Sequence, residues 1–354
     1  MKYVLFVSVL VWGMSAYAET APHQNWTLSA VLQRVGESNR EVLAARRAVD
    51  AARADQVGAS VTPPAQFSLL SQSIDTRNLG NGSLWNRPVD TIARIDKTLE
   101  RGGKAELRER GAQAGLAAAH FNEIDALRSQ SLMAAQAYWD LKLAQEQLAI
   151  TEHNWRLSQE SSRSAQLRLK QGDLSRLEAT RLAVEEDRAA NEHAQARKQL
   201  TQARMALSQA LALQDAPAIQ ASDAWPDSSV NGRLQVKPQG LQNEALQDES
   251  WLSSRADVMG AKQRLAQAQA ALALAEAQRK ADLTVTIQFE HNPSVANRLW
   301  GVGMAFPLGV DGRQEGPVAR ALVAVDDARA QLEKVRATAL SDRALQRDAL
   351  STAL

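Results

Sequence analysis

Small and apolar residues return every seven positions along the middle of the chain. This is the spacing of a coiled-coil seam, and alanine at such positions lets two helix axes approach closely. No proline interrupts residues 102–211, and good helix formers dominate that stretch. The pattern therefore predicts a long helical hairpin over residues 102–211. The seam positions are Leu127, Ala134, Leu141, Leu148 and Trp155, with Ala137 and Ala144 three residues after two of them.

The hairpin is expected to turn at residues 170–175. Gly172 can take the left-handed conformation that ends a helix, and Ser175 and Glu178 have the S-x-x-E spacing of a capping box. At 1.5 Å per residue the first arm would be about 100 Å long. A helix of this length is much longer than most globular domains contain.

Two helices and two strands are expected before the hairpin. Thr27 is placed to cap a short first helix. A second helix is expected from about residue 40 to residue 59, and Pro63 prevents it from continuing. Residues 65–72 and 90–99 have the character of strands, although their alternation is imperfect.

The same order of elements then returns. Residues 257–262 restate 41–46 at an offset of 216 positions, and after the strand loop residues 308–313 restate 99–104 at an offset of 209. The chain is therefore expected to be a tandem repeat of helix, strand, strand and long helix.

These repeats set the expected domain boundaries. Residues 19–211 form the first repeat, and residues 255–354 form the second. Between them, residues 212–254 carry several prolines and few apolar positions, which indicates an irregular connecting segment with one short helix near 241–246.

The second repeat ends early if it follows the first. Under the offset of 209, Leu354 corresponds to Gln145, in the middle of the first hairpin's outgoing arm. A faithful second hairpin would need about 66 more residues. The second hairpin is therefore expected to be incomplete, with its apolar seam from Ala321 to Leu350 partly uncovered.

The second strand pair, residues 282–290 and 298–306, alternates cleanly between an apolar face and a polar or very small one. Strands of this length are close to the 9–11 residues that a tilted strand needs to cross a bilayer. A soluble hairpin packed on a helix would show the same periodicity. The set expected to face lipid is Leu283, Val285, Ile287, Phe289, Trp300, Val302, Met304 and Phe306, and the set expected to face a lumen is Thr284, Thr286, Gln288 and Glu290.

A sheet of this kind in a membrane requires oligomerisation. Four strands cannot close a barrel, since the smallest known transmembrane barrels have eight. An open edge in lipid would leave backbone groups unpaired at several kcal/mol each. Copies of the chain would therefore share one barrel, and their helices would pack into a wider tube.

Composition adds an export signal and removes several classes of function. The chain has 354 residues, a formal net charge of +1 and no cysteine. Residues 1–18 have the form of a secretory signal peptide that ends in Ala16-Tyr17-Ala18, with an uncleaved anchor as the alternative. Loss of Lys2 leaves 40 basic and 40 acidic residues, so charge gives no reason to expect nucleic-acid binding. Without cysteine there is no disulfide, no thiolate metal site and no lipidated cysteine anchor.

Three stretches carry a family resemblance. They are Leu-Glu-Arg-Gly-Gly-Lys at 99–104, Gln-Gly-Asp-Leu-Ser-Arg-Leu-Glu at 171–178, and Phe-Pro-Leu at 306–308. Together with the twice-repeated order of elements, they resemble the TolC-type outer-membrane efflux channels. The glycine-rich turn followed by Lys104 is most similar to the branch that serves heavy-metal efflux pumps of the cobalt–zinc–cadmium type. The resemblance covers nearly all of the mature chain and is weakest over 212–254.

The resemblance implies an α+β membrane protein that forms a homotrimer. Its twelve-stranded barrel would lie in outer-membrane lipid, and its long helical hairpins would form a periplasmic tunnel. The tunnel would meet a periplasmic adaptor and an inner-membrane resistance-nodulation-division pump, so the channel itself would be a passive conduit. The adaptor-contacting tip would comprise Gly172, Asp173, Leu174 and Ser175, although a well-capped helix turn explains the same residues.

Enzymatic chemistry finds little support in the sequence. His120 and Glu123 share a helical face, but two groups do not close a metal site, and a solvated polar face explains them. The chain has no H-E-x-x-H, no G-x-S-x-G and no P-loop. No catalytic residue, metal or cofactor is therefore expected.

Three alternatives to a working channel stay open at this point. A periplasmic adaptor would have one hairpin between compact β domains, whereas this chain repeats its whole unit. A coiled-coil envelope protein without a pore would leave the apolar strand faces unexplained. A truncated, inactive channel would follow if the incomplete second hairpin prevents assembly. In a working channel, Glu290 would bias the lumen toward cations.

Overall fold

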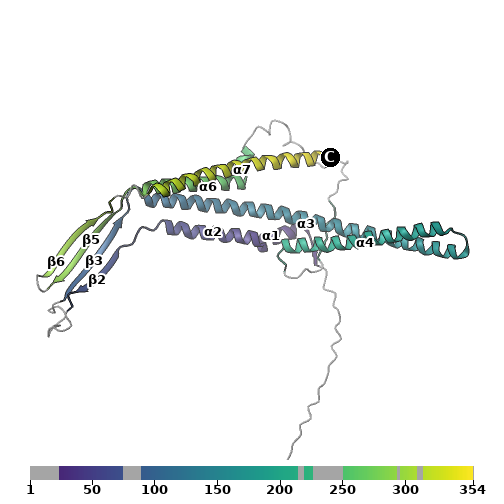
Figure 1. The fold of residues 1–354 in the computed structure, drawn as a ribbon, viewed down its shortest axis with the longest axis horizontal. Coiled ribbons are helices and arrows are strands. Elements are labelled where there is room, and N and C mark those ends of the chain that lie inside the picture. Colours follow the sequence, from purple (N-terminus) through teal and green to yellow (C-terminus); the bar gives the residue numbers. More distant parts are fainter. Residues whose placement is uncertain are drawn as a thin grey trace, which may run out of the picture. The chain divides into compact units, whose positions relative to one another are not determined.

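The computed structural model of the chain describes residues 24–74, 89–213, 219–225, 250–292, 296–308 and 314–353. The predicted leader, the helix near 241–246 and residues 309–313 lie outside them. The elements are β1 (Gln24–Trp26), α1 (Leu28–Ser38), α2 (Arg40–Ala59), β2 (Gln66–Gln72), β3 (Asp90–Leu99), α3 (Lys104–Gln171), α4 (Arg176–Ala210), β4 (Ile219–Ala221), α5 (Ser250–Ser254), α6 (Ala256–Ala277), β5 (Leu283–Asn292), β6 (Ala296–Ala305) and α7 (Glu315–Ala353). The predicted helices and strands within these residues occur in the expected order (Figure 1), and β1, β4 and α5 are present in addition.

The chain divides into two compact units. One comprises Met1–Asn39 with Gln130–Trp225, and the other comprises Arg40–Ser129 with Pro226–Leu354. Helix α3 therefore contributes residues to both. Within the described residues, no helix carries an apolar stretch long enough to cross a bilayer.

The buried side chains between α3 and α4 form most of the hydrophobic core of the first unit. Ala134, Leu141 and Ala144 of the predicted seam are buried, while Ala137 and Leu148 are partly buried against the same core. Buried leucines of α4, among them Leu200 and Leu207, complete this core with valines of α1. The seam continues at Trp155, whose ring stacks on His193 of α4 with centroids 5.1 Å apart. Leu127 is 37% exposed and belongs to the other unit.

A short parallel pair of strands joins the two ends of the first unit's sequence. β1 pairs with β4, which the sequence did not predict because each strand has only three residues. The fully buried Tyr138 holds the pair: its hydroxyl donates to the Trp26 carbonyl at 3.2 Å and accepts from the Asp223 N–H at 3.0 Å. The Asp223 carboxylate in turn accepts from the Leu28 N–H at 2.7 Å, at the start of α1.

The second unit is built from paired helices and one sheet. Helices α6 and α7 run side by side (Figure 1) over a small core that includes Leu252, Val258 and Leu332. α6 also approaches α3 closely, because a Cβ on Gly115 would lie 3.0 Å from Gln267 Nε2. The sheet has four antiparallel strands in the order β2-β3-β5-β6, so the strand hairpins of the two repeats pair with each other through β3 and β5.

Candidate functional site

The four-stranded sheet has one face whose middle rows are apolar. β5 and β6 pair so that Val285 lies opposite Met304, Ile287 opposite Val302, and Phe289 opposite Trp300. The two predicted apolar sets therefore share one side, with Phe306 one residue beyond the end of β6. β3 and β2 extend this side. What we call the apolar face consists of Phe67, Leu69, Ala93, Ile95, Leu99, Leu283, Val285, Ile287, Phe289, Trp300, Val302 and Met304.

The apolar face is open rather than packed against other described residues. Val302 is 86% exposed, Trp300 75% and Met304 74%. Large apolar side chains gathered on one exposed surface mark an interaction with lipid or with another protein. Their arrangement is regular: the rings of Phe289 and Trp300 meet edge to face with centroids 5.2 Å apart.

The opposite face of the sheet is mostly polar, apart from Leu70, Ile92 and Leu299 in the row of Glu290, and side chains tie its strands together. Thr286 donates to the Asp96 carboxylate at 2.5 Å, and Arg94 Nε donates to the same carboxylate at 2.8 Å. The hydroxyls of Thr98 and Thr284 lie 3.2 Å apart. The Thr286–Asp96 and Thr98–Thr284 contacts link β3 to β5, so they fasten the two repeats, whereas the Arg94–Asp96 bond lies within β3. The predicted lumen set of Thr284, Thr286, Gln288 and Glu290 lies on this side.

Two glycines of β6 leave room on the polar face for side chains of β5. A Cβ on Gly301 would lie 2.9 Å from Gln288 Cγ, so the Gln288 side chain occupies the space above that glycine. Gly303 faces Thr286 across the same pair of strands.

The outer edges of the sheet are formed by β2 and β6. Neither pairs with a further strand among the described residues. Their unpaired N–H and C=O groups are a template for further strands.

A buried ion pair fixes the sheet to the helices where the two repeats meet. Lys104, at the start of α3, donates from Nζ to Asp282 Oδ1 at 2.7 Å and to the Lys280 carbonyl at 2.8 Å. Asp282 also accepts from the Arg101 N–H at 3.0 Å. The Lys104 side chain is only 8% exposed. Gly102 has φ of 80° and packs against Lys280, so the glycine-rich turn brings Lys104 onto the second repeat.

A second ion pair lies beside the first. Arg108 donates to both carboxylate oxygens of Glu100, and these hydrogen bonds hold the pKa of Glu100 below its usual value. Burial opposes the ionisation of Asp282, but hydrogen bonds from Lys104 and the Arg101 N–H outweigh it and lower the pKa of Asp282. Both carboxylates therefore stay charged at neutral pH. The sequence showed Lys104 only as part of a motif and gave no sign of its partner.

The turn between α3 and α4 has the predicted form. Gly172 has φ of 86°, and the Asp173 N–H closes the end of α3 on the Arg168 carbonyl at 2.9 Å. Ser175 and Glu178 form the capping box in both directions.

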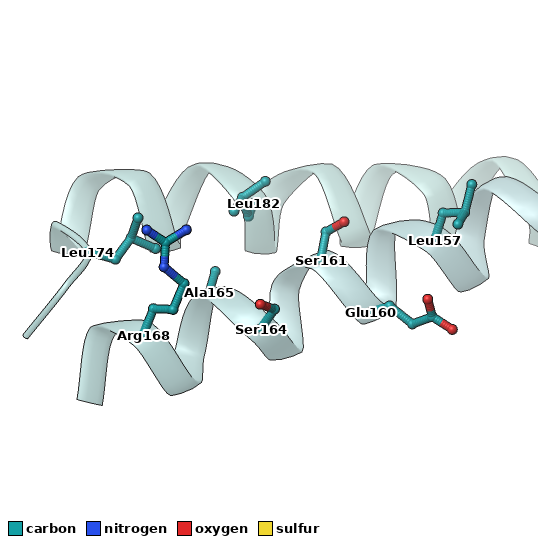
Figure 2. Close-up of a pocket in the computed structure, with 8 residues that line it drawn as sticks. All are labelled: Leu157, Glu160, Ser161, Ser164, Ala165, Arg168, Leu174 and Leu182. Carbon is teal, nitrogen blue, oxygen red and sulfur yellow. The ribbon is translucent and has the colours of Figure 1, made fainter. Parts of the chain in front are cut away.

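A shallow groove of about 460 Å³ lies between α3 and α4 next to this turn. Figure 2 shows the Arg168 side chain reaching across from α3 to lie beside Leu174. Of the four predicted tip residues, only Leu174 lines the groove. The sequence did not single out the other lining residues, which are Leu157, Glu160, Ser161, Ser164, Ala165, Arg168 and Leu182.

Substitution of Gly172 tests the turn. We expect Gly172→Ala to lower the free energy of unfolding by about 1–2 kcal/mol, because a Cβ is strained in the left-handed region. Gly58→Ala is the control, since Gly58 lies in α2 with nothing within 4 Å of its Cβ position. Denaturant unfolding should show Gly58→Ala unchanged or slightly stabilised. Equal effects of the two substitutions would contradict this account.

Glu123, which shares a helical face with His120, forms an ion pair with Arg46. His120 Nδ1 lies 3.9 Å from Glu123, but Glu123 already accepts from Arg46 Nε at 3.3 Å. In the part of the chain that the structure describes, no three His, Asp or Glu side chains gather as metal ligands would.

Comparison over the whole sequence finds no match, whereas several solved structures share the fold of the chain. No protein-family model and no curated protein matches it. The crystal structure of the Campylobacter jejuni CmeC outer membrane channel aligns with a TM-score of 0.71 and 16% identity, over 89% of this chain and 68% of CmeC.

Two further crystal structures agree. CusC, studied for folding and transmembrane channel formation, aligns with a TM-score of 0.69 and 20% identity, over 92% of this chain and 77% of CusC. A membrane protein from Pseudomonas aeruginosa aligns with a TM-score of 0.70 and 19% identity, over 89% of this chain and 74% of that protein. The chain therefore has the fold of the TolC-type outer-membrane channels that its sequence resembles.

Proposed function

We propose that the chain is one subunit of an outer-membrane channel, a passive conduit in a tripartite efflux system. The observation that carries the proposal is the sheet, which has an exposed apolar face, a mostly polar face and two edges that pair with no further strand among the described residues. Such a sheet is unstable alone in lipid and is complete when copies join edge to edge. The shared fold with CmeC and CusC supports the same conclusion.

Three copies give the proposed assembly. β6 of one subunit would pair with β2 of the next, and four strands from each subunit would close a barrel of twelve. The apolar face would then contact outer-membrane lipid, and Thr284, Thr286, Gln288 and Glu290 would line the lumen. The helices would extend into the periplasm, with the leader having directed export.

The proposed partners bind at the other end of the hairpin. A periplasmic adaptor would contact Gly172, Asp173, Leu174 and Ser175 and would link the channel to an inner-membrane resistance-nodulation-division pump. The groove beside Leu174 supports this assignment, because it offers apolar and charged side chains on one exposed surface.

The exported solute is proposed to be a cation. The glycine-rich turn with Lys104 resembles the heavy-metal branch, and Glu290 adds a carboxylate to the polar face. We expect Glu290→Gln to reduce cation over anion selectivity in single-channel recordings, because three carboxylates would leave the lumen. Thr284→Ser is the control that keeps the charge. An unchanged reversal potential in a salt gradient would remove Glu290 from this role.

The channel assignment as a whole is tested by fractionating expressing cells and measuring the mass of the detergent-extracted protein. We expect mature protein in the outer-membrane fraction with the mass of three subunits. A soluble monomer would contradict the proposal and would favour an inactive relative of the channels. Coupling to efflux is then tested by metal tolerance of cells with and without the chain.

A further inference from the structure

Two basic side chains lie near the two ends of the apolar face. Lys97 of β3 pairs with Val285, which itself lies opposite Met304, so Lys97 belongs to that side of the sheet. Arg298 lies in β6 two residues before Trp300, within the shift in register where Asn297 and Arg298 together stand against His291, and alternation from Trp300 places it on the same side. Among the described residues of the four strands, these are the only Lys, Arg, Asp or Glu side chains on this side.

The Lys97 amine points away from the apolar rows. Its Nζ donates to the Pro63 carbonyl at 2.8 Å. Since Gln66 lies opposite Asp96, Pro63 lies further toward the helical end of the sheet than Lys97 does. A lysine on an apolar surface extends in this way when its charged end seeks the water boundary.

Neither cation is neutralised within the described residues. Lys97 makes one hydrogen bond, to a carbonyl, and an ammonium has three donors. Arg298 is exposed and forms no ion pair or hydrogen bond in the described part of the chain. Arg94, on the polar face, is by contrast paired with Asp96.

The spacing of the two cations matches a bilayer. Arg298 and Met304, which is level with Lys97, are six residues apart on β6, or about 20 Å along the strand. A tilt of about 40° reduces this to about 15 Å of height, and each long side chain adds about 5 Å outward. The charged ends would then be about 25 Å apart, which is the height of the apolar band of outer-membrane barrels.

We propose that Lys97 and Arg298 bind the phosphate groups of anionic lipids at the two boundaries of the bilayer. The inference rests on the proposed membrane position of the sheet. Lipid is the occupant because both cations border an exposed apolar face, on which acyl chains would lie while the headgroup phosphates meet the charges. The lysine marks the boundary at the helical end, and the arginine marks the boundary at the far end.

The test is native mass spectrometry of the detergent-extracted protein during titration with phosphatidylglycerol. We expect Lys97→Gln and Arg298→Gln each to weaken lipid binding about fivefold per site, the effect of one cation near an anionic surface. Arg94→Gln is the matched control. It removes the same charge from the same sheet, but on the polar face, and should bind lipid as the wild type does.

Several results would overturn the inference. Equal weakening by Arg94→Gln would show that net charge alone attracts the lipid. Unchanged binding by Lys97→Gln and Arg298→Gln would remove both residues from the site. Displacement of the lipid by millimolar inorganic phosphate would assign the site to free phosphate instead. If the wild type fails to reach the outer membrane, the proposed function fails with it; if it does reach it and the variants keep their lipid, only this inference fails.

Discussion

Val302→Arg is expected to reduce the membrane-assembled protein by about 30-fold or more. Val302 lies in a middle row of the apolar face, opposite Ile287, and its side chain is 86% exposed. Arginine at the midplane on the lipid side of a barrel costs about 2–4 kcal/mol. In water the same substitution at such an exposed position would change stability by only about 0.5 kcal/mol or less. The substitution therefore distinguishes lipid from water at this face.

The control is an arginine at similar depth on the other face. Gln66 lies on β2 opposite Asp96, where an arginine would meet a carboxylate and an aqueous lumen. We expect Gln66→Arg to assemble as the wild type does. The measurement is the amount of trimer in the outer-membrane fraction of cells that express each variant equally. Normal assembly of Val302→Arg would show that lipid does not cover the apolar face.

Lys104→Met is expected to give the second large effect, a loss of about 1–3 kcal/mol in the free energy of unfolding. It leaves the Asp282 carboxylate and the Lys280 carbonyl without the ammonium that both contact. Hydrogen bonds to charged groups contribute about 1.5–3 kcal/mol. The lower part of the expected range allows for the 31% exposure of Asp282, since water screens the pair.

The matched control is Lys142→Met. Lys142 pairs with Glu146 at 3.1 Å one turn further along α3, where the Glu146 side chain is 48% exposed, and loss of such an i,i+4 pair should cost only about 0.3–0.5 kcal/mol. The double variant Lys104→Met with Asp282→Asn should lose less than the two single variants together, because the interaction can be lost only once. Simple additivity in denaturant unfolding would show that the two side chains act independently.

The pH dependence has a defined sign. Because the pKa of Asp282 is lowered in the folded chain, its contribution is fully present above its usual value of 3.8 and disappears as pH falls through the lowered pKa. The stability difference between wild type and Lys104→Met should therefore be constant near neutral pH and should shrink below about pH 3.8. A difference that grows on acidification would contradict the assigned protonation state.

The elements that the sequence predicted are those with local signals. The turn at Gly172 and the box of Ser175 and Glu178 act over a few residues, so their residue types alone indicate the outcome. The hydroxyl of Thr27 likewise accepts from the Ala30 N–H at 3.3 Å, as a helix cap should. Strand alternation was also visible, and each strand of the second pair extends two residues beyond the predicted range at its far end.

The features that the sequence did not show depend on residues far apart in the chain. Lys104 and Asp282 are separated by 178 positions, and no pattern near either one indicates the other. The strands β1 and β4 are too short to have a periodicity, and the buried hydroxyl of Tyr138 holds them together. The groove beside Leu174 requires Leu182 and Arg168 to meet across two helices, which fixes its shape only after folding.

The pairing of β3 with β5 imposes an order on folding. Thr98 and Thr284 meet across 186 positions of sequence, so the sheet cannot form until the second repeat has been made. At 5–20 residues per second, synthesis of that interval takes about 10–40 s. The α3–α4 hairpin is local and can form first, whereas the edge of β3 that pairs with β5 must wait with its N–H and C=O groups unpaired. Until β5 and β6 have been synthesised, β2 and β3 therefore form only half of the sheet. Correct assembly requires that this half does not associate with other chains before its own second repeat pairs with it.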